Sequence, residues 1–208
     1  MSIGATHTTV RRMSGAEFRS FQETRPDHER WELIKGVPVM MVPPIMSHQY
    51  IADNLTRLLN EALAKHNRSR RAVSRSGLEL EDAARAPVGA EYRPEPDVMV
   101  VDRHIEPRQR FVDRAYVLAE IVSDTDYQTV SGEKEPWIAI KRRLYIAHAH
   151  CEAVILVDPS RVDVKIDLKT KDGGISERLT SLDAQLTVPT CGLECLVADV
   201  YEATPLNP

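Results

Sequence analysis

Residues 91–123, EYRPEPDVMVVDRHIEPRQRFVDRAYVLAEIVS, contain two short apolar stretches that each carry a carboxylate where a buried strand is normally apolar. The stretch 98–101 predicts a strand that Asp97 opens, and the stretch 116–122 predicts a strand that Glu120 interrupts. Acids are rarely buried unless a partner compensates them. Two acids on neighbouring strands therefore predict that a cation lies between them or that the site binds a metal.

An internal ion pair is the alternative to a functional site at these two acids. The cations that could form such a pair are Arg93, Arg103 and Lys141. Taken alone, the two acids favour this structural interpretation. The ordered motifs described below favour a functional site instead.

Length and composition predict one compact domain. The chain has 208 residues and is 42% hydrophobic, which suits a single sizeable core. We expect a flexible N-terminal arm over 1–13, a single domain over 14–201 and a C-terminal tail over 202–208. The net charge of -4 argues against a protein that coats nucleic acid by bulk charge, so any basic patch has to be local.

The cellular compartment is predicted from the cysteines and from the absence of long apolar runs in the sequence. Three cysteines, none of them in a CxxC pair, are typical of a reducing compartment. No run approaches the roughly 20 apolar residues of a membrane span, and the first residues lack the apolar core of a signal peptide. We therefore expect a cytoplasmic protein with no membrane partner.

The first half of the chain predicts two helices around a hairpin. Ser14 and Glu17 form a capping box for a helix that ends before Pro26. Strands over 31–34 and 37–42 follow, with a turn at Lys35 and Gly36, and then a long helix over 48–66 capped by Ser47. Residues 68–82 predict either a short strand pair or an extended excursion.

The second half predicts a helix over 137–148 and further strands. The strands are expected within 152–159, 162–168, 173–181 and 184–189, and a short last helix is expected over 193–200. Together with the two acid-bearing strands, these elements predict an α/β fold with a mixed sheet of about six or more strands and helices packed against it.

Several motifs occur in a characteristic order along the chain. They are Glu32 in WELIKG, His48 after a proline-rich turn, PDVMVV, AEIVS, Lys141 with Tyr145 one turn later, and ILVDP. In this order they resemble the Uma-two family, bacterial restriction-endonuclease-like proteins of the PD-(D/E)xK nuclease superfamily. The resemblance spans roughly residues 18–200 and depends on the whole series rather than on any single motif.

The resemblance implies a restriction-endonuclease-like core, a central mixed sheet flanked by helices. It also implies that Asp97 and Glu120 bind a metal, Mg²⁺ or Mn²⁺, as hard oxygen ligands. The lysine of the parent motif would fall at Val122, and Lys141 on the following helix matches the family's lysine instead. There it would hold the attacking water or stabilise the transition state of phosphodiester hydrolysis. DNA as substrate and a homodimeric assembly are implied by the same resemblance.

Three further residues are candidates for the site. Glu32 is a candidate metal ligand, although a surface acid on a strand edge is an equal alternative. His48 could contact phosphate, orient a ligand or assist proton transfer, and Gln49 stands beside it. A histidine next to a helix N-terminus is more commonly structural, so both interpretations stay open.

Two segments have alternative interpretations. The loop between Glu120 and Lys141 carries Asp124, Asp126 and Glu133, which either lend ligands or only solvate the loop. The basic residues that either track a phosphate backbone or form a solvated face are Arg68, Arg70, Arg71, Arg75, Arg108, Arg110 and Arg114.

The sequence predicts a metal-dependent nuclease and leaves other functions open. One is a catalytically inactive module on the same fold that binds nucleic acid or protein. The other is hydrolysis of a different phosphate ester, because the same ligands suit that chemistry. The family's usual acid after the hairpin glycine is missing here, since the chain reads KGVP at 35–38.

Overall fold

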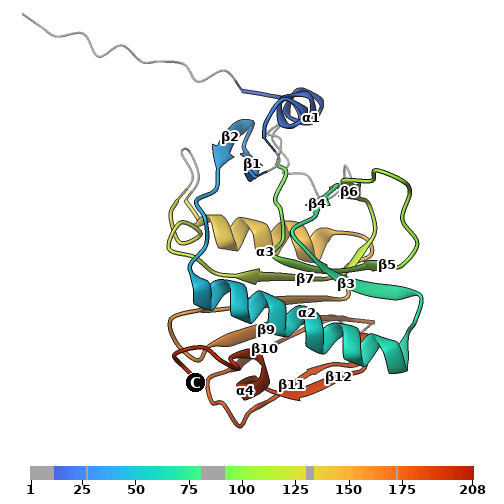
Figure 1. The fold of residues 1–208 in the computed structure, drawn as a ribbon, viewed down its shortest axis with the longest axis vertical. Coiled ribbons are helices and arrows are strands. Elements are labelled where there is room, and N and C mark those ends of the chain that lie inside the picture. The colour runs from blue at the N-terminus through green and yellow to red at the C-terminus, as the bar shows by residue number, and fades with distance from the viewer. Residues whose placement is uncertain (1–11, 27, 81–91, 130–133, 172) are drawn as a thin grey trace, which may run out of the picture.

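A six-stranded mixed sheet forms the centre of the computed structural model, which describes residues 12–26, 28–80, 92–129, 134–171 and 173–208 (Figure 1). The strand order is β10-β9-β8-β7-β5-β3. The strands are β3 (Arg70–Ser74), β5 (Val98–Asp102), β7 (Ala115–Ile121), β8 (Ala153–Val157), β9 (Val164–Thr170) and β10 (Gly173–Leu179). β7 and β8 are parallel and the other neighbouring pairs are antiparallel. The predicted mixed sheet is confirmed.

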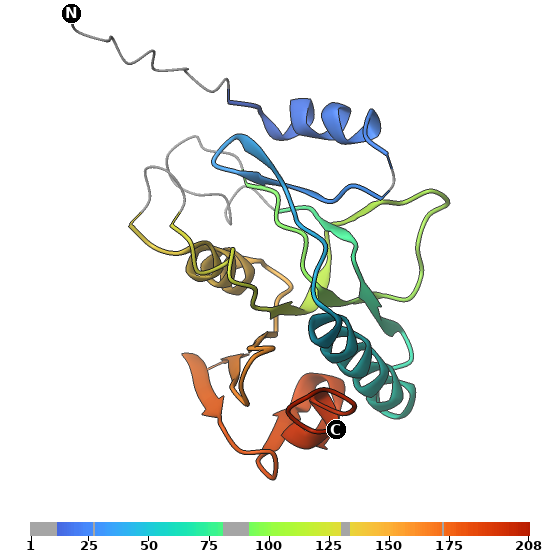
Figure 2. The same cartoon turned by 60° about the vertical axis from the view of Figure 1, so that its left-hand side comes forward.

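Helices and smaller sheets cover both faces of this sheet. Parallel strands need a crossover connection, and α3 (Trp137–Ala147) supplies it between β7 and β8 and packs on one face. The opposite face is covered by α2 (Met46–His66) and by a C-terminal unit (Figures 1 and 2). That unit consists of β11 (Gln185–Val188), the short 3-10 helix Pro189–Cys191, β12 (Leu193–Leu196) and α4 (Val197–Val200).

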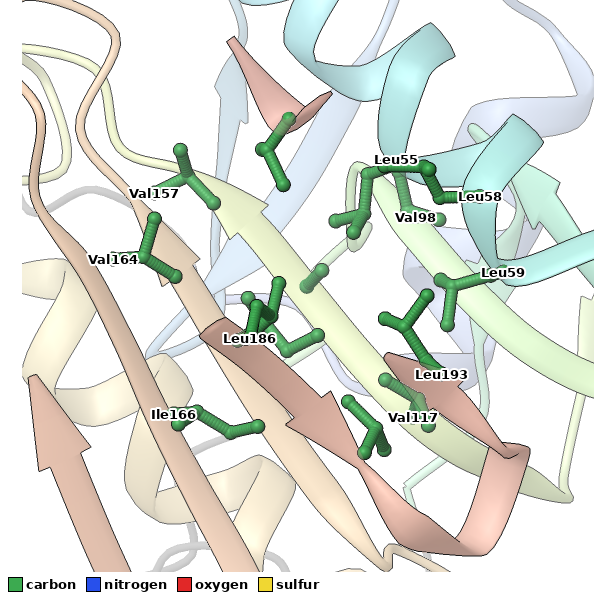
Figure 3. Close-up of a cluster of buried hydrophobic side chains, with 14 of the residues drawn as sticks. Leu55, Leu58, Leu59, Val98, Val117, Val157, Val164, Ile166, Leu186 and Leu193 are labelled. Carbon is green, nitrogen blue, oxygen red and sulfur yellow. The ribbon is translucent and has the colours of Figure 1, made fainter. Parts of the chain in front are cut away.

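The main core lies between α2, the sheet and the C-terminal unit (Figure 3). Leu55 and Leu59 of α2 are fully buried against Val98 and Val117, and Leu193 closes the cluster from β12. These α2 residues recur at helical spacing, which is why the sequence predicts this helix well. A second cluster on the other face packs α3 against the sheet.

The N-terminal elements form a separate layer at one end of the sheet (Figure 1). The helix α1 (Gly15–Glu23) begins with the predicted capping box of Ser14 and Glu17. It is followed by a hairpin of β1 (Trp31–Ile34) and β2 (Val37–Met40). Lys35 and Gly36 have φ values of 53° and 77°, the left-handed conformations that a tight hairpin turn requires. The predicted turn is therefore confirmed, although β2 ends two residues earlier than expected.

Two local predictions were wrong, and one of two alternatives is excluded. Ser47 lies inside α2, which starts at Met46 after the N-cap residue Ile45, and no side chain caps it. β3 does not pair with β4 (Gly77–Leu78); β3 joins β5, and β4 pairs with β6 (Phe111–Val112). The expected last helix is a strand over its first half, because β12 completes a hairpin with β11. For the strands, pairing partners distant in sequence outweighed the local pattern.

Within the described residues, no helix is both long and apolar enough to cross a membrane. The predicted arm over 1–13 falls almost entirely outside these residues, as does Glu133.

Candidate active site

The pleat of the sheet brings Asp97 and Glu120 to the same face. Val98 pairs with Ala119 in the antiparallel register of β5 and β7, and the N–H of Asp97 donates to the carbonyl of Ala119 at 3.0 Å. Side chains alternate between the two faces of a sheet along a strand. The side chain of Asp97 therefore lies on the same face as that of Met99, and the side chain of Glu120 lies on the same face as that of Leu118. This is the face that α3 covers. Both acids are buried, with exposed fractions of 5% and 1%. The predicted convergence of the two acids is confirmed.

Asp97 has partners at both carboxylate oxygens. Arg30 Nη1 donates to Oδ1 at 3.0 Å, and the backbone N–H of Ile121 donates to Oδ2 at 2.9 Å. His48 Nε2, from the first turn of α2, lies 3.2 Å from Oδ2. Burial works to raise the pKa of Asp97, but the hydrogen bond and charge of His48, together with Arg30, outweigh it and hold the pKa far below its usual range. Asp97 is therefore an ionised carboxylate.

Lys141 occupies the centre of a group of three acids. Its Nζ lies 3.0 Å from Glu32 Oε1, 3.1 Å from Glu120 Oε2 and 3.2 Å from Asp126 Oδ1. Burial alone would lower the pKa of this ammonium group, but the carboxylates of Glu120, Glu32 and Asp126 raise it well above its usual value. The buried lysine is thus a permanent cation.

Glu120 connects the two parts of the site. Burial raises its pKa well above the usual value, the ammonium group of Lys141 opposes that rise, and the charges of Asp97, Asp126 and Glu32 add to it. The Tyr145 O–H, one helical turn after Lys141, donates a short hydrogen bond to Oε1. The tyrosine fixes the orientation of the carboxylate, and the lysine supplies its counter-charge.

Glu32 is fully buried on β1, so the alternative of a surface acid was wrong. Trp137 Nε1 donates to its Oε2 at 2.8 Å, and the backbone N–H of Glu95 donates to its Oε1 at 2.9 Å. With Lys141 as a third contact, the carboxylate is held from three directions. A buried acid with this many donors has a fixed position in the site.

These groups line a small cavity of about 50 Å³, whose wall includes Arg30, His48, Asp97, Glu120, Asp126 and Lys141. Two atoms on its wall have no hydrogen-bond partner among the described residues, His48 Nδ1 and Asp126 Oδ1, although the latter forms the ion pair with Lys141. Gln49 lies outside this cavity and lines a neighbouring pocket of about 300 Å³ together with His48 and Asp97. The predicted residues are therefore together, except for Gln49, which is adjacent.

The sequence interpretation missed Arg30 and the role of Tyr145, and it left open whether Asp126 belongs to the site. Asp126 was recognised only as one of three loop acids, and the structure separates them because Asp124 is exposed. Arg30 precedes a strand without any motif that marks it. Of the cations proposed as structural partners, only Lys141 is in the cluster, because Arg93 pairs with Glu79 and Arg103 is exposed.

The order of motifs along the chain is that of a known family. A family model described as "Putative restriction endonuclease", Uma2, matches residues 16–198, which is most of the chain. The chain belongs to the Uma2 family. This is the family that the ordered motifs indicate. No curated protein matches this Uma2 chain.

The fold of this Uma2 protein is also found in a solved structure. It is similar to the crystal structure of "a putative nuclease belonging to DUF820 from Anabaena variabilis ATCC 29413", with a TM-score of 0.63 and 18% sequence identity. The match covers 88% of this chain and 96% of that chain. Similarity at this level of identity shows the fold. Support for a nuclease comes from the family model and not from this structure.

Proposed function

We propose that the protein is a metal-dependent nuclease that hydrolyses phosphodiester bonds of DNA, with Mg²⁺ or Mn²⁺ bound by Asp97 and Glu120 and with Lys141 acting on the scissile phosphate. The observation that carries this proposal is the convergence of Asp97, Glu120 and Lys141 on one buried cavity. They come from two adjacent strands and the crossover helix. An excess of buried acids beside a permanent cation is unusual unless the site performs chemistry.

The residues of the cavity fit a divalent cation in chemistry and charge. Four carboxylates, those of Glu32, Asp97, Glu120 and Asp126, face two permanent cations, Arg30 and Lys141. Carboxylate oxygens are the ligands that Mg²⁺ and Mn²⁺ prefer, and Asp126 Oδ1 lacks a hydrogen-bond donor. Among the described side chains, no three of the His, Cys, Asp and Glu type are already arranged around one point as metal ligands. Lys141 stands between three of the acids, so metal binding requires the acids to shift around it.

The chain's own residues have separate tasks in this proposal. A bound ion would lower the pKa of a coordinated water and neutralise charge on the phosphate. Asp97 and Glu120 would hold that ion, while Tyr145 keeps the Glu120 carboxylate oriented. The Lys141 ammonium would donate hydrogen bonds to the water or to the phosphate oxygens, where negative charge increases during the reaction. Glu32 and Asp126 hold the ammonium in place, and Glu32 is also a candidate further ligand.

The proposal predicts cleavage of DNA that requires a divalent metal. Purified protein is incubated with supercoiled plasmid and with linear DNA in Mg²⁺, in Mn²⁺ and in EDTA, and products are separated on agarose gels. We expect nicked or linear products with metal and none in EDTA. A double variant, Asp97→Asn with Glu120→Gln, purified in parallel gives the background of contaminating nucleases. Cleavage no greater than this background would contradict the proposal for these substrates.

A catalytically inactive binding module on the same fold is the second candidate. One observation favours it: Arg30, His48 and the Ile121 amide already satisfy the Asp97 carboxylate, as expected where ion pairs have replaced a metal. Such a module would bind nucleic acid or protein without regard to divalent metal.

A homodimer, which would place one site on each DNA strand, fits the nuclease better than the binding module. Light scattering measures whether the protein forms this dimer.

Metal titration separates the two candidates. In the nuclease, Asp97→Asn removes a ligand while keeping the size of the side chain, so Mn²⁺ affinity measured by calorimetry falls by more than about tenfold. Circular dichroism and the thermal unfolding temperature confirm that the variant is folded. If wild type and variant take up Mn²⁺ equally, or if neither takes it up, the binding module is favoured.

A further inference from the structure

A groove lined by arginines lies next to the acid cavity. Its volume is about 970 Å³, and its walls come from α1, the segments 25–26, 28–31 and 41–44, the start of α2, residues 75–77 and the segment 108–111. Three glutamates line it against six arginines, which are Arg19, Arg25, Arg30, Arg75, Arg108 and Arg110. The groove is therefore positive in a chain whose net charge is -4. A local excess of this kind attracts polyanions.

Not all of these arginines are engaged inside the protein. Arg19 pairs with Glu79, Arg30 pairs with Glu95 and Asp97, and the guanidinium group of Arg25 lies 4.7 Å from the centre of the Phe21 ring. For Arg75 and Arg108, by contrast, no carboxylate within the described part of the chain forms an ion pair. These two positive charges are available to an anionic ligand.

The backbone at the same two arginines is unusual. Arg75 has a φ of 55° and Arg108 a φ of 66°, the left-handed region in which a residue with a Cβ is strained. Glycine or asparagine would occupy either turn at lower cost. Strained conformations persist where the surrounding structure enforces them, and they concentrate at binding sites. Both strained positions lie on the wall of one groove, and both present an arginine.

The groove is continuous with the acids. Arg30, Val42 and Pro44 line both the groove and the acid cavity. Gln49 and Arg75 line both the groove and the pocket that contains His48 and Asp97. In addition, the N–H of Arg75 donates to the carbonyl of Asp97 at 3.3 Å, so the backbone of this arginine is attached to that of the acid. A chain lying in the groove would thus pass Arg75 and continue to Asp97.

We propose that this groove binds the sugar–phosphate backbone of a single nucleic-acid strand that continues into the acid cavity, with Arg75 and Arg108 contacting successive phosphates. The inference rests on the proposed function and names the form of its substrate. A single strand fits better than a duplex because the acids are almost completely buried beyond the groove, where the rim of a rigid duplex does not reach. Recognition through arginines tracks the backbone and carries little sequence preference.

The structure also divides the basic residues that the sequence grouped together. Arg75, Arg108 and Arg110 line the groove. Arg70 forms a bidentate pair with Glu152, and Arg114 pairs with Asp102, away from the groove. Arg71 is exposed on β3, four residues before Arg75, and does not line the groove. It provides a matched control of equal charge.

Binding of a fluorescently labelled oligothymidylate, measured by anisotropy in EDTA at several salt concentrations, tests the inference without any cleavage. Arg75→Ala and Arg108→Ala should each weaken binding by about three- to tenfold and reduce the slope of log affinity against log salt by about 0.7. Arg71→Ala should leave both values close to wild type. Equal binding by all four proteins would overturn the proposal, as would tighter binding of the same strand within a duplex.

The binding assay and the cleavage assay fail independently. If the two groove variants lose affinity but wild type never cuts DNA in Mg²⁺ or Mn²⁺, the groove is supported and the nuclease proposal fails. If wild type cuts DNA and the groove variants bind the oligonucleotide normally, the nuclease proposal stands and the groove is overturned. Thermal unfolding of each variant shows that a loss of binding does not reflect a loss of fold.

Discussion

In metal-free buffer, Lys141→Met is expected to lower the free energy of unfolding by about 3–5 kcal/mol. Methionine has a similar length, so packing against the Trp137 ring is largely kept. Among the described residues, Lys141 is the only cation that lies within 3.2 Å of Glu32, Glu120 and Asp126 alike, and the variant loses it. Uncompensated carboxylates in a buried site are costly, since neither water nor a counter-charge stabilises them. Urea unfolding followed by tryptophan fluorescence measures the loss.

The loss in the variant should depend on pH. Burial already raises the pKa of Glu120 in the wild type, and removal of the ammonium group raises it further. A carboxyl group with a raised pKa binds more protons in the folded than in the unfolded protein, so stability decreases as pH rises through that range. The difference between variant and wild type should therefore be smallest in acid and should grow toward neutral and alkaline pH. A difference that shrinks as pH rises would contradict this charge arrangement.

Divalent metal should recover part of this stability. A ligand that binds only the folded state stabilises it by mass action, and the variant has more unbalanced negative charge to offer an ion. Mg²⁺ should therefore raise the unfolding temperature of Lys141→Met by more than that of wild type. Cleavage should still fall by about 10²–10³-fold, because the transition state loses its lysine. Lys65→Met, on the exposed end of α2, should change neither the rise in unfolding temperature with Mg²⁺ nor the rate of cleavage. Equal behaviour of Lys141→Met and Lys65→Met in both measurements would contradict the prediction.

The positions of Asp97 and Glu120 could be predicted because they depend on a local rule. Alternation along a strand fixes the face of each side chain, and two adjacent apolar strands fix the register within narrow limits. Lys141 comes from a helix separated from Glu120 by a long loop, and no local pattern assigns it to the site. Only the ordered motifs of the family indicated it.

Arg30 and Asp126 could not be predicted for a physical reason. Both lie in irregular segments, where neither the helical nor the strand period determines the direction of a side chain. The Asp126 carboxylate is turned inward by the N–H and O–H of Ser123, at 2.9 and 2.5 Å, which form a tight turn directly after β7. An Asp three residues after a Ser at a strand end is a usable signal, but Asp124 in the same loop is equally acidic and is exposed.

The errors in the fold have the same origin as those in the site. Residues 193–200 have a helical composition, yet the first four form β12 because β11 offers them a hairpin partner. For residues 68–82 the alternative of a strand pair is excluded, because β3 pairs with β5 in the main sheet and β4 pairs with β6. Strand pairing is decided by contacts distant in sequence, whereas the long amphipathic α2 is encoded within its own residues.

Leu55→Ala is expected to lower the free energy of unfolding by about 3–5 kcal/mol while leaving metal affinity unchanged. Leu55 is fully buried, with an exposed fraction of 0%, in the core between α2 and the sheet (Figure 3). Truncation removes apolar contacts and leaves a cavity that the rigid sheet cannot collapse to fill. Calorimetric unfolding and urea titration measure the loss.

Leu55→Ala separates an effect on stability from an effect on the site, because Leu55 and the acids lie on opposite faces of the sheet. Val98 and Val117 face α2, whereas Glu120 faces Lys141 of α3. The Leu55 cavity therefore leaves the acids in place, and Mn²⁺ affinity measured well below the unfolding temperature should match wild type. Ile105→Ala, at a side chain that is 61% exposed, should cost no more than about 0.5 kcal/mol. If Leu55→Ala costs no more than Ile105→Ala, then α2 does not pack on the sheet as described, and the position of His48 beside Asp97 loses its support, because α2 carries that histidine.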